Sequence, residues 1–140
     1  NPSASTIVNK GVNPIAFAAN FDIDKKEALM KLLHPIGYTP EIDDTKIEAY
    51  AVISAMGHTY FFFQMHKLKE LAVGFGMNEK EAEVTIGEML KGSVETMFNA
   101  GLSFAEVDNL VPVKPLGDAE ESIKGYYDQY LKSIYNKIKS

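Results

Sequence analysis

The sequence contains neither cysteine nor tryptophan among its 140 residues. Without cysteine it can form no disulfide framework, no thiolate zinc site and no covalent enzyme intermediate on a thiol. Basic residues are also in deficit, because 14 Lys and Arg stand against 19 Asp and Glu, a net charge of −5. Nucleic-acid-binding proteins usually carry a basic face, so we expect no nucleic-acid partner.

The start of the chain lacks the marks of a secretory signal. It opens Asn1-Pro2-Ser3-Ala4-Ser5, with neither Met nor a basic segment followed by an apolar one. We therefore expect a cytoplasmic location. A first residue other than Met also leads us to expect a chain that was processed or cut from a longer protein.

Long hydrophobic runs are missing too, with one stretch that needs a closer look. This stretch runs from Ala49 to Met65 and is almost uncharged. A membrane span needs about 20 apolar residues, whereas this one is shorter and contains Ser54, Gly57, His58, Thr59 and Gln64. A helix that is apolar on all sides is typical of a protein interior or a subunit interface. We expect no membrane association and a helix buried within the protein or a dimer.

Residues 11–42 follow a β-α-β pattern. Apolar residues over 11–19 and 38–42 predict two short strands, and Pro14 either argues against the first strand or places it at a sheet edge. Between them Asp24 is the expected cap of a short helix. Two strands and one helix bury too little apolar surface to fold alone. We therefore expect residues 1–43 to be the trailing edge of a larger sheet.

From residue 44 to residue 140 the pattern is helical. We predict helices over residues 46–73, 79–99, 104–110 and 118–138. The expected caps are Asp44 or Thr45 for the first helix, Asn78 for the second and Ser103 for the third. The one GxG segment, Gly74-Phe75-Gly76, follows a predicted helix and lacks a third Gly, so we interpret it as a helix stop and not as a dinucleotide-binding loop.

The histidines do not predict a metal site. His58 and His66 are separated by eight positions, which does not match the four-residue spacing of a helical zinc pair. His58 follows Gly57 at an expected kink in the long helix. Two interpretations stay open for it: a buried, hydrogen-bonded imidazole, or a proton donor or substrate contact.

The order of these pieces resembles the C-terminal part of the pyrroline-5-carboxylate reductases. Members of that family read Met-Pro-Asn-Thr-Pro before a Gly-Val strand, where this chain has Pro2-Ser3-Ala4-Ser5 before Gly11-Val12. Their Ser-Gly-Ser-Gly-Pro-Ala-Tyr segment corresponds to residues 54–60, which keep Ser54, Gly57 and Tyr60. The match runs from residue 2 to about residue 111.

This resemblance implies a mainly α fold: a helical dimerisation bundle, similar to the C-terminal domain of 6-phosphogluconate dehydrogenases, preceded by a small β-α-β remnant of a Rossmann-type domain. It implies an NAD(P)H-dependent reduction of a small-molecule C=N or C=O substrate, as in proline biosynthesis. NADP or NAD would belong to the parent protein, and none is expected for this chain alone. It also implies a homodimer through the helix from Ala49 to Met65.

On the positions that match the family motifs, the resemblance implies a role for five residues. Ser3 would contact the cofactor. Ser54, Met56 and Gly57 would surround the substrate, and His58 would be the catalytic group.

The segment after Val111 departs from the family. The family's Ser-Pro-Gly-Gly-Thr-Thr loop holds the substrate, whereas residues 112–118 contain no hydroxyl, and Pro112 and Pro115 lack N–H donors. The chain also lacks the strand–GxGxxG–helix half that binds a dinucleotide. The alternative is a non-catalytic dimerisation or interaction module derived from the family, and whether the chain belongs to an enzyme stays open.

Overall fold

The computed structural model describes residues 3–139, so Pro2 of the resembled motif lies outside the described residues. The chain forms two compact units. One comprises the chain up to Tyr60 together with Lys124 and the residues after it, and the other is Phe61–Ile123. The predicted domain boundary after residue 43 is a different division of the chain and stays a prediction.

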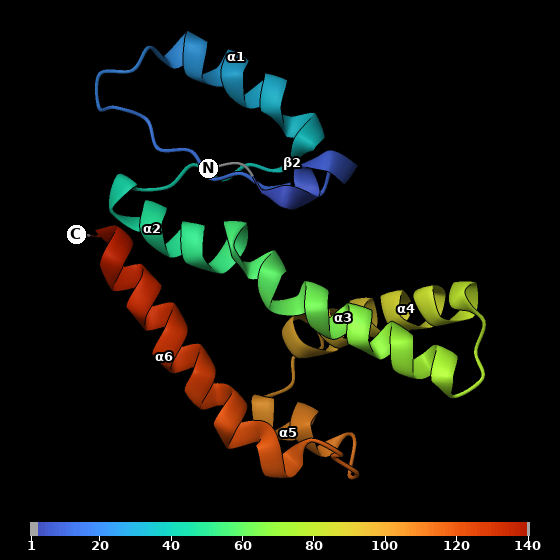
Figure 1. Cartoon of the computed structure of the whole chain (residues 1–140). Coiled ribbons are helices and arrows are strands. Elements are labelled where there is room, and N and C mark those ends of the chain that lie inside the picture. The colour runs from blue at the N-terminus through green and yellow to red at the C-terminus, as the bar shows by residue number, and fades with distance from the viewer. Residues whose placement is uncertain (1–2, 140) are drawn as a thin grey trace. The chain divides into compact units, whose positions relative to one another are not determined.

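The first unit begins with a β-α-β piece, as predicted (Figure 1). Its elements in order are η1 (a 3₁₀ turn, Ala4–Val8), β1 (Gly11–Val12), α1 (Ile23–Leu33), η2 (a 3₁₀ turn, His34–Ile36) and β2 (Gly37–Tyr38). The strands pair in parallel, with Gly11 opposite Gly37 and Val12 opposite Tyr38. α1 therefore forms the crossover that parallel strands require.

The strands predicted over residues 11–19 and 38–42 are longer than those observed, because a proline interrupts their pairing. The N–H of Asn13 still donates to a β2 carbonyl at 2.8 Å. The return bond would need an N–H at position 40, and Pro40 has none. Pairing resumes only as an isolated bridge at Ile15.

α1 is capped by Asp22 and not by Asp24 as predicted. The Asp22 carboxylate accepts a hydrogen bond from the backbone N–H of Lys25 at 3.0 Å. Asp24 lies in the first turn, where a negative charge interacts favourably with the helix dipole. Both aspartates thus favour a helix start at this point, and the hydrogen bond to Lys25 identifies Asp22 as the cap.

The helix predicted over residues 46–73 is divided into segments. After η3 (a 3₁₀ turn, Asp44–Lys46) come α2 (Ile47–Tyr50), η4 (a π-helical turn, Ala51–Ala55) and α3 (Gly57–Gly74). The break expected at Gly57 and His58 begins earlier, in the π-helical turn.

The cap at the start of this region is Asp43, and the prediction of Asp44 or Thr45 is wrong. The Asp43 carboxylate accepts from the N–H of Thr45 at 2.9 Å and from its hydroxyl at 2.6 Å. These two hydrogen bonds hold the pKa of the Asp43 carboxyl below its usual value. Thr45 is therefore the donor in this cap, and its partner precedes it by two positions.

The second unit has helix ends set by local signals, and these agree with the predictions. α3 closes in a Schellman motif: Gly76, at φ +103°, donates its N–H to Val73 at 3.0 Å, and the N–H of Met77 donates to Ala72 at 3.1 Å. Asn78 and Glu81 then form a capping box at the start of α4 (Glu79–Asn99).

The end of α4 and the start of α5 follow the same logic. Gly101, at φ +71°, turns the chain after α4. Ser103 and Glu106 form a second capping box for α5 (Phe104–Asn109). After a loop and η5 (a 3₁₀ turn, Gly117–Ala119), α6 (Glu120–Lys139) completes the chain. The predicted helices over 79–99, 104–110 and 118–138 are thus present with small shifts at their ends.

A three-residue ion cluster connects α3 to α4. The Lys69 ammonium lies 2.7 Å from the carboxylate of Glu83 and 3.1 Å from that of Glu79. These hydrogen bonds raise the pKa of Lys69, and the bond from Lys69 lowers the pKa of Glu83. Solvent screens the pairs, so they contribute little stability but favour one orientation of the two helices.

Few apolar side chains are buried in the described part of the chain. Val52 and Ala82 are the buried hydrophobic residues over residues 3–139, and no large side chain there is fully buried. A self-sufficient domain of this length buries a contiguous apolar core. None of the helices in this range is long and apolar enough to cross a membrane.

Replacing Gly37 by Ala is expected to destabilise the β-α-β piece. Gly37 has φ +129°, which side-chain-bearing residues rarely adopt, and a Cβ there would overlap the backbone of Gly11. Backbone strain alone costs about 1–3 kcal/mol, so we expect the free energy of unfolding to fall by at least about 2 kcal/mol when the clash is added. Urea unfolding followed by circular dichroism measures this.

Gly125→Ala is the matched control for Gly37→Ala. A Cβ at Gly125 meets nothing within 4 Å in the described chain. The same substitution in the interior of α6 should therefore raise stability by about 0.5–1 kcal/mol. An unchanged unfolding midpoint for Gly37→Ala would contradict the close approach of the two strand glycines.

Candidate functional site

Two segments far apart in the sequence meet at His58. The side chain of Ser3, which precedes η1, is buried at 4% exposure, and its Oγ lies 2.7 Å from Nε2 of His58. His58 is the second residue of α3 and is partly buried. The structure therefore joins the predicted cofactor-contacting residue directly to the predicted catalytic residue.

Ser5 also reaches the His58 ring. Its Oγ lies 3.4 Å from Nδ1 and 3.3 Å from Nε2. Both distances are longer than the 2.7 Å between Ser3 and Nε2. The bond to Ser3 is therefore the shorter one, and Ser5 is a second polar neighbour of the ring.

Asn13 holds Ser3 from the other side. Its Oδ1 accepts the backbone N–H of Ser3 at 3.0 Å and the hydroxyl of Thr6 at 3.0 Å. Asn13 is 6% exposed, and its Nδ2 is a buried donor for which the described residues supply no hydrogen-bond acceptor. The amide is thus oriented by two donors that both need its oxygen.

The π-helical turn before His58 is stabilised by side-chain hydroxyls. The Tyr60 hydroxyl donates to the carbonyl of Val52 at 2.6 Å, and the Ser54 hydroxyl donates to the carbonyl of Tyr50 at 2.7 Å. A change between π-helical and α-helical bonding leaves carbonyls without a regular N–H partner. Hydroxyl donors near this change satisfy such groups.

Tyr60 is itself packed by the last helix. Tyr127 of α6 contacts it edge-to-face, with ring centroids 6.0 Å apart and an interplanar angle of 84°. Burial raises the pKa of the Tyr60 phenol. A phenol kept in its protonated form is the donor that the Val52 carbonyl needs.

The other predicted site residues do not contact His58 through their side chains in any bond described above. Ser54 donates to its own helical turn, and Met56 presents its carbonyl to the hydroxyl of Thr59 at 2.7 Å. Gly57 is buried at the start of α3. The substrate-binding role predicted for these three residues stays a prediction.

Sequence reasoning missed the residues that support Ser3. Asn13 and Thr6 were hidden because their role depends on a three-dimensional contact between η1 and β1. One signal was available: Asn13 is a polar residue inside an apolar segment, and such a side chain requires a hydrogen-bond partner when the segment is buried.

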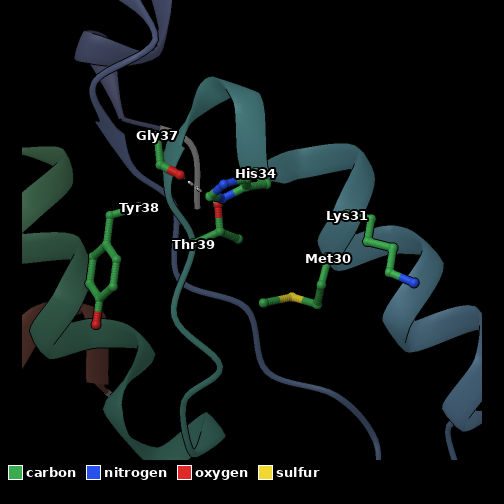
Figure 2. Close-up of a pocket in the computed structure, with 6 residues that line it drawn as sticks. All are labelled: Met30, Lys31, His34, Gly37, Tyr38 and Thr39. Carbon is green, nitrogen blue, oxygen red and sulfur yellow. Dashed lines mark hydrogen bonds between the residues drawn. The ribbon is translucent and has the colours of Figure 1, made fainter.

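A separate hollow of about 670 Å³ lies at the end of α1 and the start of β2 (Figure 2). Its lining residues are Met30, Lys31, His34, Gly37, Tyr38 and Thr39. Within it the Thr39 hydroxyl donates to the carbonyl of Gly37 at 3.4 Å (Figure 2). No predicted site residue lines it, so it does not bear on the candidate site.

The described residues show neither a metal site nor a phosphate cradle. Over residues 3–139 no group of three His, Asp or Glu side chains could hold a metal ion. The GxG segment ends α3 in the Schellman motif described above, and its N–H groups are used in closing that helix.

No protein-family model and no curated protein matches the sequence. Solved structures do match it. The NADP-bound pyrroline carboxylate reductase of Plasmodium falciparum superposes with a TM-score of 0.76 at 18% identity, over 99% of this chain and 59% of that chain. The fold of this chain is therefore similar to that of a part of this reductase. The resemblance read from the motifs is thereby confirmed for the fold.

Two bacterial enzymes give the same result. The pyrroline-5-carboxylate reductase of Coxiella burnetii matches with a TM-score of 0.61 at 21% identity, over 99% of this chain and 52% of that chain. The enzyme from Streptococcus pyogenes matches with a TM-score of 0.78 at 12% identity, over 99% and 56%. The chain thus spans a little over half the length of each, and the predicted fold class, mainly α with a β-α-β piece in front, is confirmed.

Tyr60→Phe is expected to lower the free energy of unfolding by about 1 kcal/mol, because it removes the hydroxyl that donates to Val52 and keeps the ring. Thermal or urea unfolding measures the difference. Tyr126→Phe is the control, since its ring lies on α6 and is 60% exposed. Equal losses for the two variants would mean that the hydroxyl of Tyr60 does not support the π-helical turn.

Proposed function

We propose that the chain is the C-terminal portion of a pyrroline-5-carboxylate reductase-like, NAD(P)H-dependent oxidoreductase that reduces a C=N or C=O bond. The hydrogen bond between Ser3 and His58 carries this proposal. It brings together the two segments in which the family motifs predict the cofactor contact and the catalytic group. The similarity of fold to three such reductases supports it.

In this proposal His58 supplies a proton to the reduced bond. Hydride addition to C=N or C=O leaves negative charge on the nitrogen or oxygen, and a nearby imidazole can neutralise it. Ser3 orients the ring by its bond to Nε2. Ser54, Met56 and Gly57 precede His58 and would line the place where the small-molecule substrate binds.

NADP or NAD would supply the hydride in the parent protein. In this proposal Ser3 would contact the nicotinamide end of the cofactor, and the GxG segment would not hold the pyrophosphate, because its N–H groups close α3. The parent would be cytoplasmic and take part in proline biosynthesis, as the resemblance implies.

The test is NADPH oxidation with pyrroline-5-carboxylate, measured on the full-length protein. If His58 is the proton donor, His58→Gln should lower kcat by roughly 100-fold or more, the usual contribution of a general acid, with a smaller change in KM. His66→Gln is the control, because His66 is exposed on α3 and its neighbour is Glu70.

The outcomes separate the hypotheses. Equal rates for wild type and His58→Gln would remove His58 from the mechanism. Cofactor binding without turnover would indicate a reductase of another substrate. If the protein neither binds the cofactor nor turns over, the alternative of a non-catalytic dimerisation module is favoured.

One observation favours that second candidate. The segment between α5 and α6, which stands where the family holds its substrate, is exposed from Leu110 to Asp118. Its Lys114 pairs with Asp108. This segment has no hydroxyl, and its lysine is paired with an aspartate of the preceding helix, α5. It is therefore poorly suited to holding a carboxylate substrate.

We further propose a homodimer through the helix from Ala49 to Met65. Its large side chains are exposed in the single chain, including Ile53 at 68% and Phe63 at 67%. Three consecutive phenylalanines, Phe61, Phe62 and Phe63, are all half-exposed or more. Apolar surface of this kind on a chain with almost no core is typical of an obligate interface.

Phe63→Glu is expected to convert the dimer to monomer at micromolar concentration, because it places a charge in the apolar interface. Light scattering coupled to size exclusion measures the mass. Leu32→Glu is the control, since Leu32 is equally exposed, at 73%, but lies on α1. A monomeric wild-type protein would contradict the proposal.

A further inference from the structure

We propose that Asn13 is a positioning residue that sets the orientation of His58 by holding Ser3. The inference rests on the proposed function of His58 and deepens it. It begins with the backbone of Asn13, which donates its N–H to the carbonyl of Tyr38 at 2.8 Å and so belongs to the parallel pairing of β1 and β2. The side chain therefore starts from a backbone position that is tied to β2.

The Asn13 side chain links this backbone position to the segment before it, Ser3 and η1. Its Oδ1 accepts from the backbone N–H of Ser3 and from the hydroxyl of Thr6, each at 3.0 Å. Ser3 immediately precedes η1 and Thr6 lies in its middle. A single oxygen therefore holds the turn at two points. Ser3 and Asn13 are both more than nine-tenths buried, so water competes little for these bonds.

The choice of asparagine at this position is informative. Its Nδ2 is a buried donor without an acceptor among the described residues, which costs free energy. A smaller or apolar residue would avoid that cost but would lose the acceptor that Ser3 and Thr6 share. An aspartate would keep the acceptor and bury a charge. The asparagine thus supplies a neutral acceptor of the right length, at the expense of one unsatisfied amide.

The position of Ser3 affects His58 through the Oγ atom of Ser3. With its backbone N–H fixed, Ser3 has its Oγ 2.7 Å from Nε2 of His58. Ser5, in the same turn, has its Oγ 3.3 Å from Nε2 and 3.4 Å from Nδ1. Loss of the Asn13 acceptor would release η1, and with it the two hydroxyls that define how the imidazole lies.

Nitrogen-15 NMR of the histidine rings tests this in the full-length protein, without any need for enzymatic activity. Ser3→Ala removes the hydroxyl itself and gives the reference displacement of the His58 ring signals. We expect Asn13→Leu, which keeps the bulk and removes the acceptor, to move these signals in the same direction by more than half of that displacement. The ring signals of His34 and His66 should stay in place.

Two further variants complete the experiment. Asn20→Leu is the matched control, because Asn20 is exposed in the turn before α1 and should leave His58 unchanged. Thr6→Val removes the second donor to Asn13 with little change of shape, and we expect a smaller displacement of the same sign.

Each of these measurements supports or overturns the role proposed for Asn13. Wild-type His58 signals in a folded Asn13→Leu protein would overturn the proposal, even if its unfolding midpoint falls. If Asn13→Leu does not fold, Asn13→Ala, which adds no bulk, is read in the same way. If neither variant folds, hydrogen exchange of the Ser3 amide is measured in the wild-type protein. Exchange at an unprotected rate would overturn the proposal, and protection from exchange would support it. Failure of the reductase assay would leave this readout intact, so the two proposals can fail separately.

Discussion

Hydrophobic burial is the constraint on which the rest of this structure depends, because the described chain achieves so little of it. Besides Pro14, only Val52 and Ala82 are buried apolar side chains over residues 3–139. The free energy that normally balances chain entropy is therefore mostly missing from the contacts within one chain. Local devices fix the helix ends, but capping boxes and ion pairs contribute too little to replace a core.

The parts of the fold that the sequence predicted are the parts that local rules decide. Asn78 and Ser103 cap their helices because each is followed three positions later by a glutamate, and Gly76 and Gly101 end helices because they tolerate positive φ. The length of the strands could not be read locally, since it depends on Pro40 standing where an N–H would have to donate to the carbonyl of Asn13. Two aspartates near one helix start are likewise equivalent until geometry separates them.

The candidate site also has parts that the sequence predicts and parts that it does not. The resemblance placed Ser3 and His58 by motif, and the structure joins them by a hydrogen bond. The sequence marks Asn13 only as a polar residue inside an apolar segment, and its partners depend on contacts between segments. The π-helical turn could not be predicted, because no residue type specifies that pattern of hydrogen bonds. The hydroxyl of Tyr60 is the exception in hindsight, since a tyrosine in an apolar run needs an acceptor when it is partly buried.

The departures from the family motifs are physically linked, and this argues against treating them as independent losses. Ser5 and His58 both stand where the family has proline, yet here the two side chains lie against each other. Two prolines can make only apolar contact, whereas a serine and a histidine create a polar junction between η1 and α3. Ser3, which stands where the family has asparagine, supplies the shortest bond in that junction. Three replacements thus meet at one imidazole, and the hydrogen bonds between them link the three positions physically.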